Sequence, residues 1–140
     1  NSRNVIPGRV KFSIDLRNAS DALCDAMDAD IRGVAARLNA ETGLPIEITQ
    51  VSAYPAQPFH ADCIDAVQRA ATALGYSNMP AVSGAGHDAV YMARLAPAGM
   101  IFVPCKDGIS HNPLEYSSYE DLALGAEVLY GTVQGVLNRG

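Results

Sequence analysis

One stretch near the N-terminus decides the expected fold: Arg9-Val-Lys-Phe-Ser-Ile-Asp-Leu-Arg17. Apolar and polar residues alternate along it, so every second side chain of an extended backbone would point to the same side. The alternation predicts a β-strand that has one face toward a core and one face toward water. Pro7-Gly8, a turn signal, precedes the stretch.

A helix is expected directly after this strand. Ser20 is suited to cap its N-terminus, because a serine hydroxyl can accept a hydrogen bond from the first backbone amides, and Gly43 is suited to end it. Between them the apolar residues recur every three or four positions: Leu23, Met27, Ile31, Val34 and Leu38. Residues 44–54 predict a second strand. Residues 9–54 are therefore expected to form a β-α-β unit.

Pro55-Ala-Gln-Pro58 interrupts this pattern and is the expected domain boundary. Beyond it, helical stripes alternate with a continuous apolar run at residues 100–103, which predicts a strand buried on both faces. The expected fold class is therefore α/β, and the expected domains are residues 1–56 and 57–140.

Three helices are expected in the second domain. Apolar spacing places them at residues 64–74, at 88–95 and after Ser117 or Ser118, one of which would cap the last helix. That helix carries an apolar stripe, and Leu124 and Val128 lie off the stripe. We therefore expect it to be covered on more than one side.

Composition excludes several classes of protein. A 140-residue chain that is 49% hydrophobic carries enough apolar surface to fold, and it contains no stretch of about 20 apolar residues that could cross a membrane. Ten basic against fifteen acidic side chains give a net charge of −5, which argues against a nucleic-acid partner. Three widely spaced cysteines favour a reducing cytoplasm. The chain shows no leader peptide, and its abrupt start suggests part of a longer protein.

The loop Ser83-Gly-Ala-Gly-His-Asp-Ala89 is the first place where chemistry is expected. Its glycines would let the backbone approach a ligand closely, and the helix that follows would favour an anionic group. His87 could donate a hydrogen bond to a developing oxyanion. The alternative is a glycine-rich turn in which Asp88 serves as a helix cap. The loop is not a nucleophile elbow, because Ala81 stands where that motif needs glycine.

The loop Lys106-Asp-Gly-Ile-Ser-His-Asn-Pro-Leu-Glu115 is the second place. It follows the expected buried strand, where open α/β sheets bind their ligands. His111 could ligate a metal ion through a neutral ring nitrogen. The alternative is a surface histidine in a turn.

Other residues of suitable type fit ordinary structural roles. His60 and Asp62 resemble a metal pair, but they lie in the proline-rich junction, so we expect His60 in a loop and Asp62 as the N-cap of a helix. Cys105 is the only cysteine near a candidate loop. Arg17 is either a solvated charge or a clamp for a carboxylate, which a guanidinium binds with two parallel hydrogen bonds.

Four segments together resemble one known family: Asn4-Val-Ile-Pro-Gly8 with Phe12-Ser-Ile-Asp-Leu-Arg17, Ser83-Gly-Ala-Gly-His-Asp-Ala89, Gly99-Met-Ile-Phe-Val-Pro104 and Gly108-Ile-Ser-His-Asn-Pro-Leu-Glu115. The chain is similar to the C-terminal third of the zinc-dependent amidohydrolases that include N-carbamoyl-L-amino acid hydrolases, β-ureidopropionases and allantoate amidohydrolases. The segments span nearly the whole chain in the family's order and spacing, and together they are far more specific than any one of them.

The resemblance implies a role for five residues. His111 matches a ligand of a site with two divalent metal ions. Gly86 and His87 match the pair that binds substrate beside the reacting carbonyl, and His87 would be the catalytic donor. Asn4 and Arg17 match residues of a lid domain that hold the substrate carboxylate and reach into the neighbouring subunit's active site.

The resemblance also implies how the chain is divided. Residues 1–56 would be the second half of a lid, or dimerisation, domain. Residues 57–140 would be the C-terminal segment of a zinc aminopeptidase-like catalytic domain. The other metal ligands and the general base of the family would belong to a part of the enzyme that this chain lacks, so the isolated chain is expected to be inactive.

The expected activity is hydrolysis of a linear amide, the ureido group of an N-carbamoyl-L-amino acid. Zinc is the expected metal, with manganese, cobalt and nickel as alternatives, and a homodimer formed through the lid domain is the expected assembly. Two other functions stay open. One is an allantoate amidohydrolase or a related aminoacylase or peptidase, and the other is a non-catalytic fragment that keeps only lid and packing surfaces.

Overall fold

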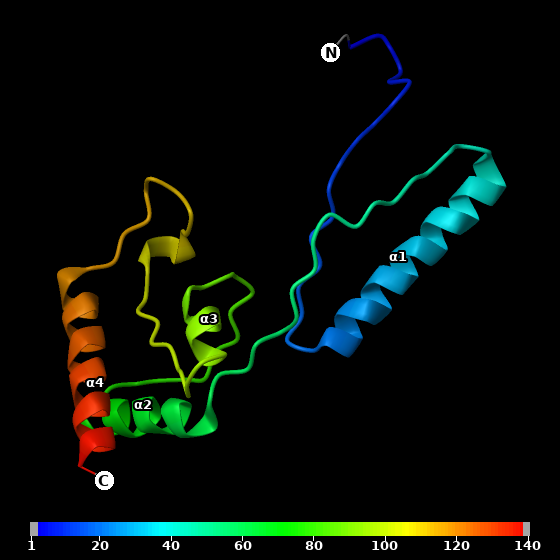
Figure 1. Ribbon diagram of the computed structural model, residues 1–140. Coiled ribbons are helices and arrows are strands. Elements are labelled where there is room, and N and C mark those ends of the chain that lie inside the picture. The colour runs from blue at the N-terminus through cyan, green and yellow to red at the C-terminus, as the bar shows by residue number, and fades with distance from the viewer. Residues whose placement is uncertain (1–2, 139–140) are drawn as a thin grey trace. The chain divides into compact units, whose positions relative to one another are not determined.

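The computed structural model describes residues 3–138 (Figure 1). Its elements, in chain order, are the helices α1 (Asp21–Thr42), α2 (Ala61–Ala73) and α3 (Ala89–Ala93), the short 3₁₀ helix η1 (Lys106–Gly108) and the helix α4 (Tyr119–Leu137). The chain divides between Ala56 and Gln57 into two compact units. Within residues 3–138, none of these helices combines the length and the apolar character that crossing a bilayer requires.

The helix of the first unit, α1, begins and ends at the residues that its sequence predicts. The Ser20 hydroxyl accepts a hydrogen bond from the Leu23 amide (3.4 Å), and Gly43 takes up a left-handed conformation with φ 69° and donates its amide to the Asn39 carbonyl (2.9 Å). Asp21 Oδ1 accepts the Ala56 amide at 2.7 Å, which ties the start of α1 to the end of the unit. Both predicted caps are therefore confirmed.

The expected β-α-β unit is wrong. Residues 9–17 and 44–54 flank α1 as extended chain, but neither is a strand, and no sheet forms anywhere in residues 3–138. Alternating polarity specifies which side chains would share a face, but a strand also needs a neighbouring backbone that pairs with its amides and carbonyls. Without that partner the apolar side stays open: Phe12 is 77% exposed. The described chain is a helical assembly and not an α/β fold.

The caps in the second unit differ in part from expectation. The N-terminus of α2 is capped by His60, not by Asp62, because the His60 Nδ1 lone pair accepts the Asp62 amide at 3.3 Å. Asp62 already lies inside the helix. Of the two serines expected as the N-cap of α4, Ser118 is the cap, because its hydroxyl accepts a hydrogen bond from the Asp121 amide at 3.0 Å.

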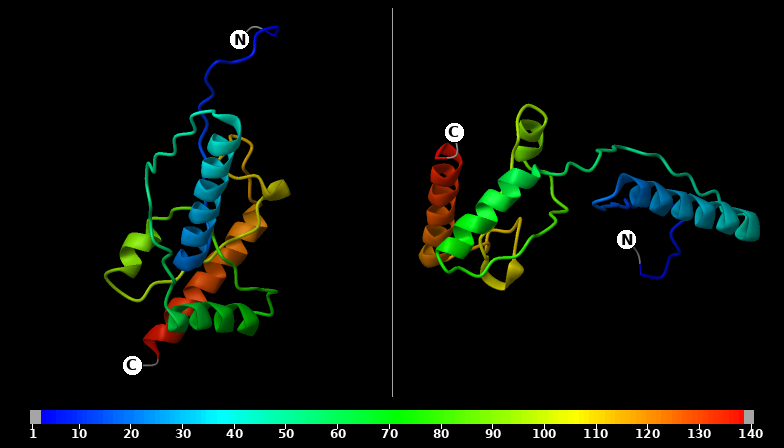
Figure 2. Two further views of the ribbon diagram at one scale, coloured as in Figure 1. Left: turned by 90° about the vertical axis from the view of Figure 1, so that its right-hand side faces the viewer. Right: turned by 90° about the horizontal axis from the view of Figure 1, so that it is seen from below.

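The helices α2 and α4 pack against each other and provide the small core of the second unit (Figure 2). The buried residues are Ala66 and Ala71 on α2 and Val128 on α4. Val128 lies off the apolar stripe of α4, and the stripe itself is about half exposed. The Tyr76 hydroxyl also donates to the Glu127 carboxylate, which favours the neutral phenol and raises the pKa of Tyr76 above its ordinary value.

An extended segment, residues 98–104, lies against both helices. The His60 amide donates to the Ala98 carbonyl at 2.9 Å. A side-chain carbon added to Gly99 would lie 3.1 Å from Cys63 Cβ, and one added to Gly125 of α4 would lie 2.5 Å from Val103 Cγ1. Glycine is therefore what allows the segment to approach the helices this closely.

The strand expected at residues 100–103 is also wrong, since this segment has no backbone ladder. Nor is it buried on both faces, because Phe102 is 54% exposed. An unpaired extended segment still points successive side chains to opposite sides. Val103 accordingly faces α4, while Phe102 lies against the ring of His87.

We expect Gly125→Ala to destabilise the protein relative to Gly135→Ala. Both changes add a methyl group inside α4, which by itself favours the helix by about 0.5–1 kcal/mol. Only at Gly125 does the added carbon meet Val103, and overpacking of this kind costs about 1–3 kcal/mol. The free energies of unfolding in denaturant measure the difference.

A double variant checks the cause. Val103→Ala removes Cγ1, so Gly125→Ala should cost much less in that background than in the wild type. Equal costs in both backgrounds would show that the close approach of Val103 is not what requires glycine.

Candidate functional site

The glycine-rich loop before α3 holds His87 by its ring. The Ser83 hydroxyl oxygen lies 2.6 Å from His87 Nε2, and the same oxygen accepts the Ala85 amide at 3.1 Å. The His87 carbonyl accepts the Val90 amide at 3.0 Å, so the histidine stands at the start of α3. The Ser83 hydroxyl at the start of the loop and the backbone hydrogen bond at its His87 end thus restrain where the imidazole lies.

A second contact comes from the extended segment 98–104. The rings of His87 and Phe102 meet edge to face, with centroids 5.6 Å apart and planes at 64°. His87 is half-buried in this position. The imidazole is therefore restrained from two sides, by a hydroxyl on Nε2 and by an aromatic ring.

The loop backbone is open at Gly86. A side-chain carbon added to Gly86 would meet nothing within 4 Å. Asp88 occupies the N-cap position of α3 but makes no capping hydrogen bond with its side chain. The alternative interpretation, in which Asp88 caps the helix with its side chain, is therefore not supported by a hydrogen bond.

His111 lies in a tight turn after η1. Its own backbone has a positive φ of 55°, and its amide donates to Glu115 Oε2 at 2.8 Å. Asn112 Oδ1 accepts the Leu114 amide at 2.9 Å and closes the same turn. These bonds present the His111 side chain as an exposed group.

The residues around His111 do not form a metal site by themselves. Among residues 3–138, no group of three or more histidine, cysteine, aspartate or glutamate side chains is arranged to hold a metal ion. A site for a divalent metal needs about four ligands, so His111 could supply one of them. The ligand set within the described chain therefore does not fit a metal ion.

In the first unit, the Arg17 guanidinium pairs with a carboxylate of its own chain. Arg17 donates to the carboxylate of Asp15 from Nε (3.0 Å to Oδ2) and from Nη2 (2.5 Å to Oδ2). This pairing lowers the pKa of Asp15 and raises the pKa of Arg17, chiefly through the shared hydrogen bonds. The guanidinium is thus arranged to bind a carboxylate, and here it binds one from its own chain. Asn4 lies exposed in a turn of the same unit.

The structure places the predicted residues in two units. Asn4 and Arg17 belong to the first, and Gly86, His87 and His111 belong to the second. Sequence reasoning missed the contacts of Ser83 and Phe102 with His87. The spacing of four residues between Ser83 and His87 gave no signal, because the loop between them is not helical.

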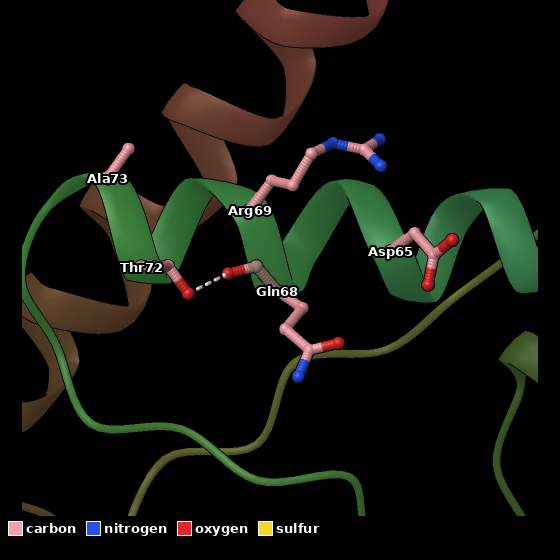
Figure 3. A pocket seen from close by; sticks show the side chains of 5 residues that line it. All are labelled: Asp65, Gln68, Arg69, Thr72 and Ala73. Atoms are coloured by element: carbon pink, nitrogen blue, oxygen red, sulfur yellow. Dashed lines mark hydrogen bonds between the residues drawn. The ribbon is translucent and has the colours of Figure 1, made fainter.

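A shallow hollow on α2 is a weaker candidate for a binding site than this loop. It runs along α2 and is lined by Asp65, Gln68, Arg69, Thr72 and Ala73 (Figure 3). Gln68 and Arg69 project to different sides of the helix. The Thr72 hydroxyl donates a hydrogen bond to the Gln68 carbonyl at 2.8 Å. The side chains do not converge on a point where a small molecule would be held.

Comparison with known proteins identifies the family. The model of peptidase family M20/M25/M40 matches residues 5–135. The chain belongs to peptidase family M20/M25/M40. The resemblance inferred from the four sequence segments is thereby confirmed, because the relatives of this chain within the M20 family include amidohydrolases of the expected kinds.

The chain is similar to two curated relatives and to one solved structure. The chain is 43% identical over 133 residues to an N-carbamoyl-L-amino-acid amidohydrolase of Rhizobium meliloti, covering 95% of this chain and 32% of the relative. It is 36% identical over 129 residues to an allantoate amidohydrolase of Bacillus subtilis, covering 92% and 31%. A crystal structure of an amidase of the hydantoinase/carbamoylase family from Burkholderia multivorans matches with a TM-score of 0.80 and 43% identity, over 82% of this chain and 28% of that one.

The chain thus spans about a third of the length of the curated relatives that it matches. Family M20 is in general metal-dependent, and its members that resemble this chain are hydrolases. The relationship to amidohydrolases follows from these matches. The activity, the substrate and the metal do not follow from them.

We expect the 140-residue chain by itself not to bind zinc stoichiometrically, because its described residues supply too few converging ligands. Calorimetric titration with zinc measures this, and His111→Gln should give the same weak isotherm. Stoichiometric binding that His111→Gln abolishes would show that this chain assembles a metal site that its residue arrangement does not predict.

Proposed function

We propose that this chain is part of a metal-dependent amidohydrolase that cleaves the ureido C–N bond of N-carbamoyl-L-amino acids. The observation that carries the proposal is the restrained imidazole of His87, held by Ser83 and Phe102 in the loop that matches the family's substrate-binding motif. The name of the Rhizobium meliloti relative, at 43% identity, supports the substrate class.

In this proposal His87 acts on the reacting carbonyl. A half-buried N–H beside a substrate carbonyl stabilises the negative charge that develops on the oxygen in the transition state. The donor is most effective when it does not reorganise during the reaction, and the contacts of His87 with Ser83 and Phe102 restrict such movement. Gly86 leaves the backbone beside His87 open to the substrate.

Arg17 and Asn4 hold the substrate carboxylate. The guanidinium of Arg17 already binds a carboxylate through two of its nitrogens, and a substrate carboxylate would take the place of Asp15. Asn4 would add a side-chain amide donor. Residues 1–56 would form part of the lid and dimerisation domain, through which two copies associate, and residues 57–140 would belong to the catalytic domain.

His111 would be one ligand of a site with two divalent metal ions, zinc first among them. Because the described residues provide no complete ligand group, the remaining ligands would come from outside this chain, and the chain alone would be inactive. A reducing cytoplasm belongs to the same proposal, since Cys24, Cys63 and Cys105 are free thiols.

An allantoate amidohydrolase is the second candidate. It is favoured by the 36% identity to the Bacillus subtilis enzyme of that name, which is lower than the 43% identity to the carbamoyl amino acid enzyme. Turnover of N-carbamoyl-L-amino acids and of allantoate by the whole protein, compared at equal concentration, decides between the two.

We expect His87→Ala to lower kcat about 10²–10³-fold in the whole enzyme while changing KM much less. The reason is that the donor acts on charge that develops only in the transition state. Steady-state kinetics with an N-carbamoyl-L-amino acid measure the change. His60→Asn is the matched control, because asparagine can also cap α2, and it should keep both constants. An unchanged kcat for His87→Ala would reject the proposed role.

We expect Arg17→Ala to raise KM for substrates that carry a carboxylate by about 10-fold or more, with little change in kcat, because a bidentate charge-assisted contact is lost. A substrate in which the carboxylate is replaced by a carboxamide should lose much less. Arg9→Ala is the matched control, since Arg9 is an exposed arginine of the same stretch. If affinity for the carboxylate substrate survives in Arg17→Ala, the clamp does not exist.

A further inference from the structure

We propose that Ser83 is a positioning residue that keeps the proton of the neutral His87 ring on Nδ1. The inference rests on the proposed function, in which His87 donates an N–H to the substrate. A neutral imidazole carries one proton on one of two nitrogens, and the hydrogen bond at one nitrogen decides where that proton sits. Ser83 makes that bond at Nε2.

The distance indicates which partner is the donor. The Ser83 oxygen and His87 Nε2 are 2.6 Å apart. An N–H that donates to oxygen commonly keeps about 2.7–3.2 Å, so the contact is shorter than the usual range for Nε2–H as the donor. The short contact therefore favours the hydroxyl as donor and Nε2 as acceptor.

The surroundings of the hydroxyl agree with this direction. Its oxygen already accepts the Ala85 amide at 3.1 Å, which holds the serine side chain over its own loop. When the hydroxyl donates to Nε2, it has both a donor and an acceptor bond within the loop. When it accepts from Nε2 instead, its proton has no partner in the loop.

The contact with Ser83 determines which ring nitrogen of His87 carries the N–H that can donate a hydrogen bond. With Nε2 accepting from Ser83, the proton of the neutral ring must lie on Nδ1. Phe102 restrains the plane of the same ring by its edge-to-face contact. Nδ1–H is then the group that the loop presents to a substrate, without any need to protonate the ring.

Nitrogen-15 NMR of the whole protein, labelled at histidine, tests the inference at alkaline pH, where imidazoles are neutral. Protonated and unprotonated ring nitrogens resonate far apart, and comparison with His87→Gln assigns the signals. We expect a protonated Nδ1 and an unprotonated Nε2 in the wild type. A protonated Nε2 in the wild type overturns the proposal.

Three serine variants identify the cause. Ser83→Ala should move the His87 proton toward Nε2, the nitrogen favoured by imidazole side chains in water, while Ser83→Thr keeps the hydroxyl and should keep the wild-type signals. Ser77→Ala, an exposed serine of the same unit, should change nothing. Unchanged His87 signals in Ser83→Ala, or signals in Ser83→Thr that match Ser83→Ala, would contradict the assigned role.

Kinetics of the same variants separate this inference from the proposed function. Ser83→Ala should lower kcat by about 10- to 100-fold, the range typical for loss of a group that orients a functional histidine, with KM little changed and Ser83→Thr restoring kcat. If His87→Ala leaves activity intact while the NMR result holds, the proposed function fails and the Ser83 assignment stands. If His87→Ala abolishes activity and the proton lies on Nε2, the Ser83 assignment alone fails.

Discussion

The close approach of residues 98–104 to α2 and α4 is the constraint on which the second unit depends. Gly99 against Cys63 and Gly125 against Val103 leave no room for larger side chains. Because the segment is extended, facing Val103 toward α4 directs Phe102 the other way, onto the ring of His87. The contact of the Val103 side chain with α4 thus accompanies the placement of the Phe102 ring against the imidazole that we propose as the catalytic donor.

The two side chains that we propose as functional groups, His87 and Arg17, are held in different ways. His87 is half-buried and held at one ring nitrogen, so its chemistry depends on how precisely the loop places it. Arg17 is an exposed cation paired with Asp15, so its chemistry depends on exchange between two carboxylates. An oxyanion donor gains from being fixed before the reaction, whereas a substrate clamp must release what it binds.

Local chemistry made the helix boundaries predictable. A hydroxyl at Ser20 or Ser118 and a left-handed glycine at Gly43 act within a few residues, so sequence spacing specifies them. The strands predicted at residues 9–17 and 44–54 are absent, because a strand depends on a distant partner and not on local chemistry. Their polarity pattern was read correctly, but a strand exists only where a second backbone supplies the hydrogen-bond partners.

The sequence by itself determined the family, the candidate residues and most helix ends, because motifs and caps are short-range features. Only the tertiary structure decided that His60 and not Asp62 caps α2, and that Ser83 and Phe102 meet His87. These depend on backbone angles and on contacts between distant segments. Ser83 lies four positions before His87 in the sequence, yet the backbone between them can adopt many conformations, and only the folded structure selects one.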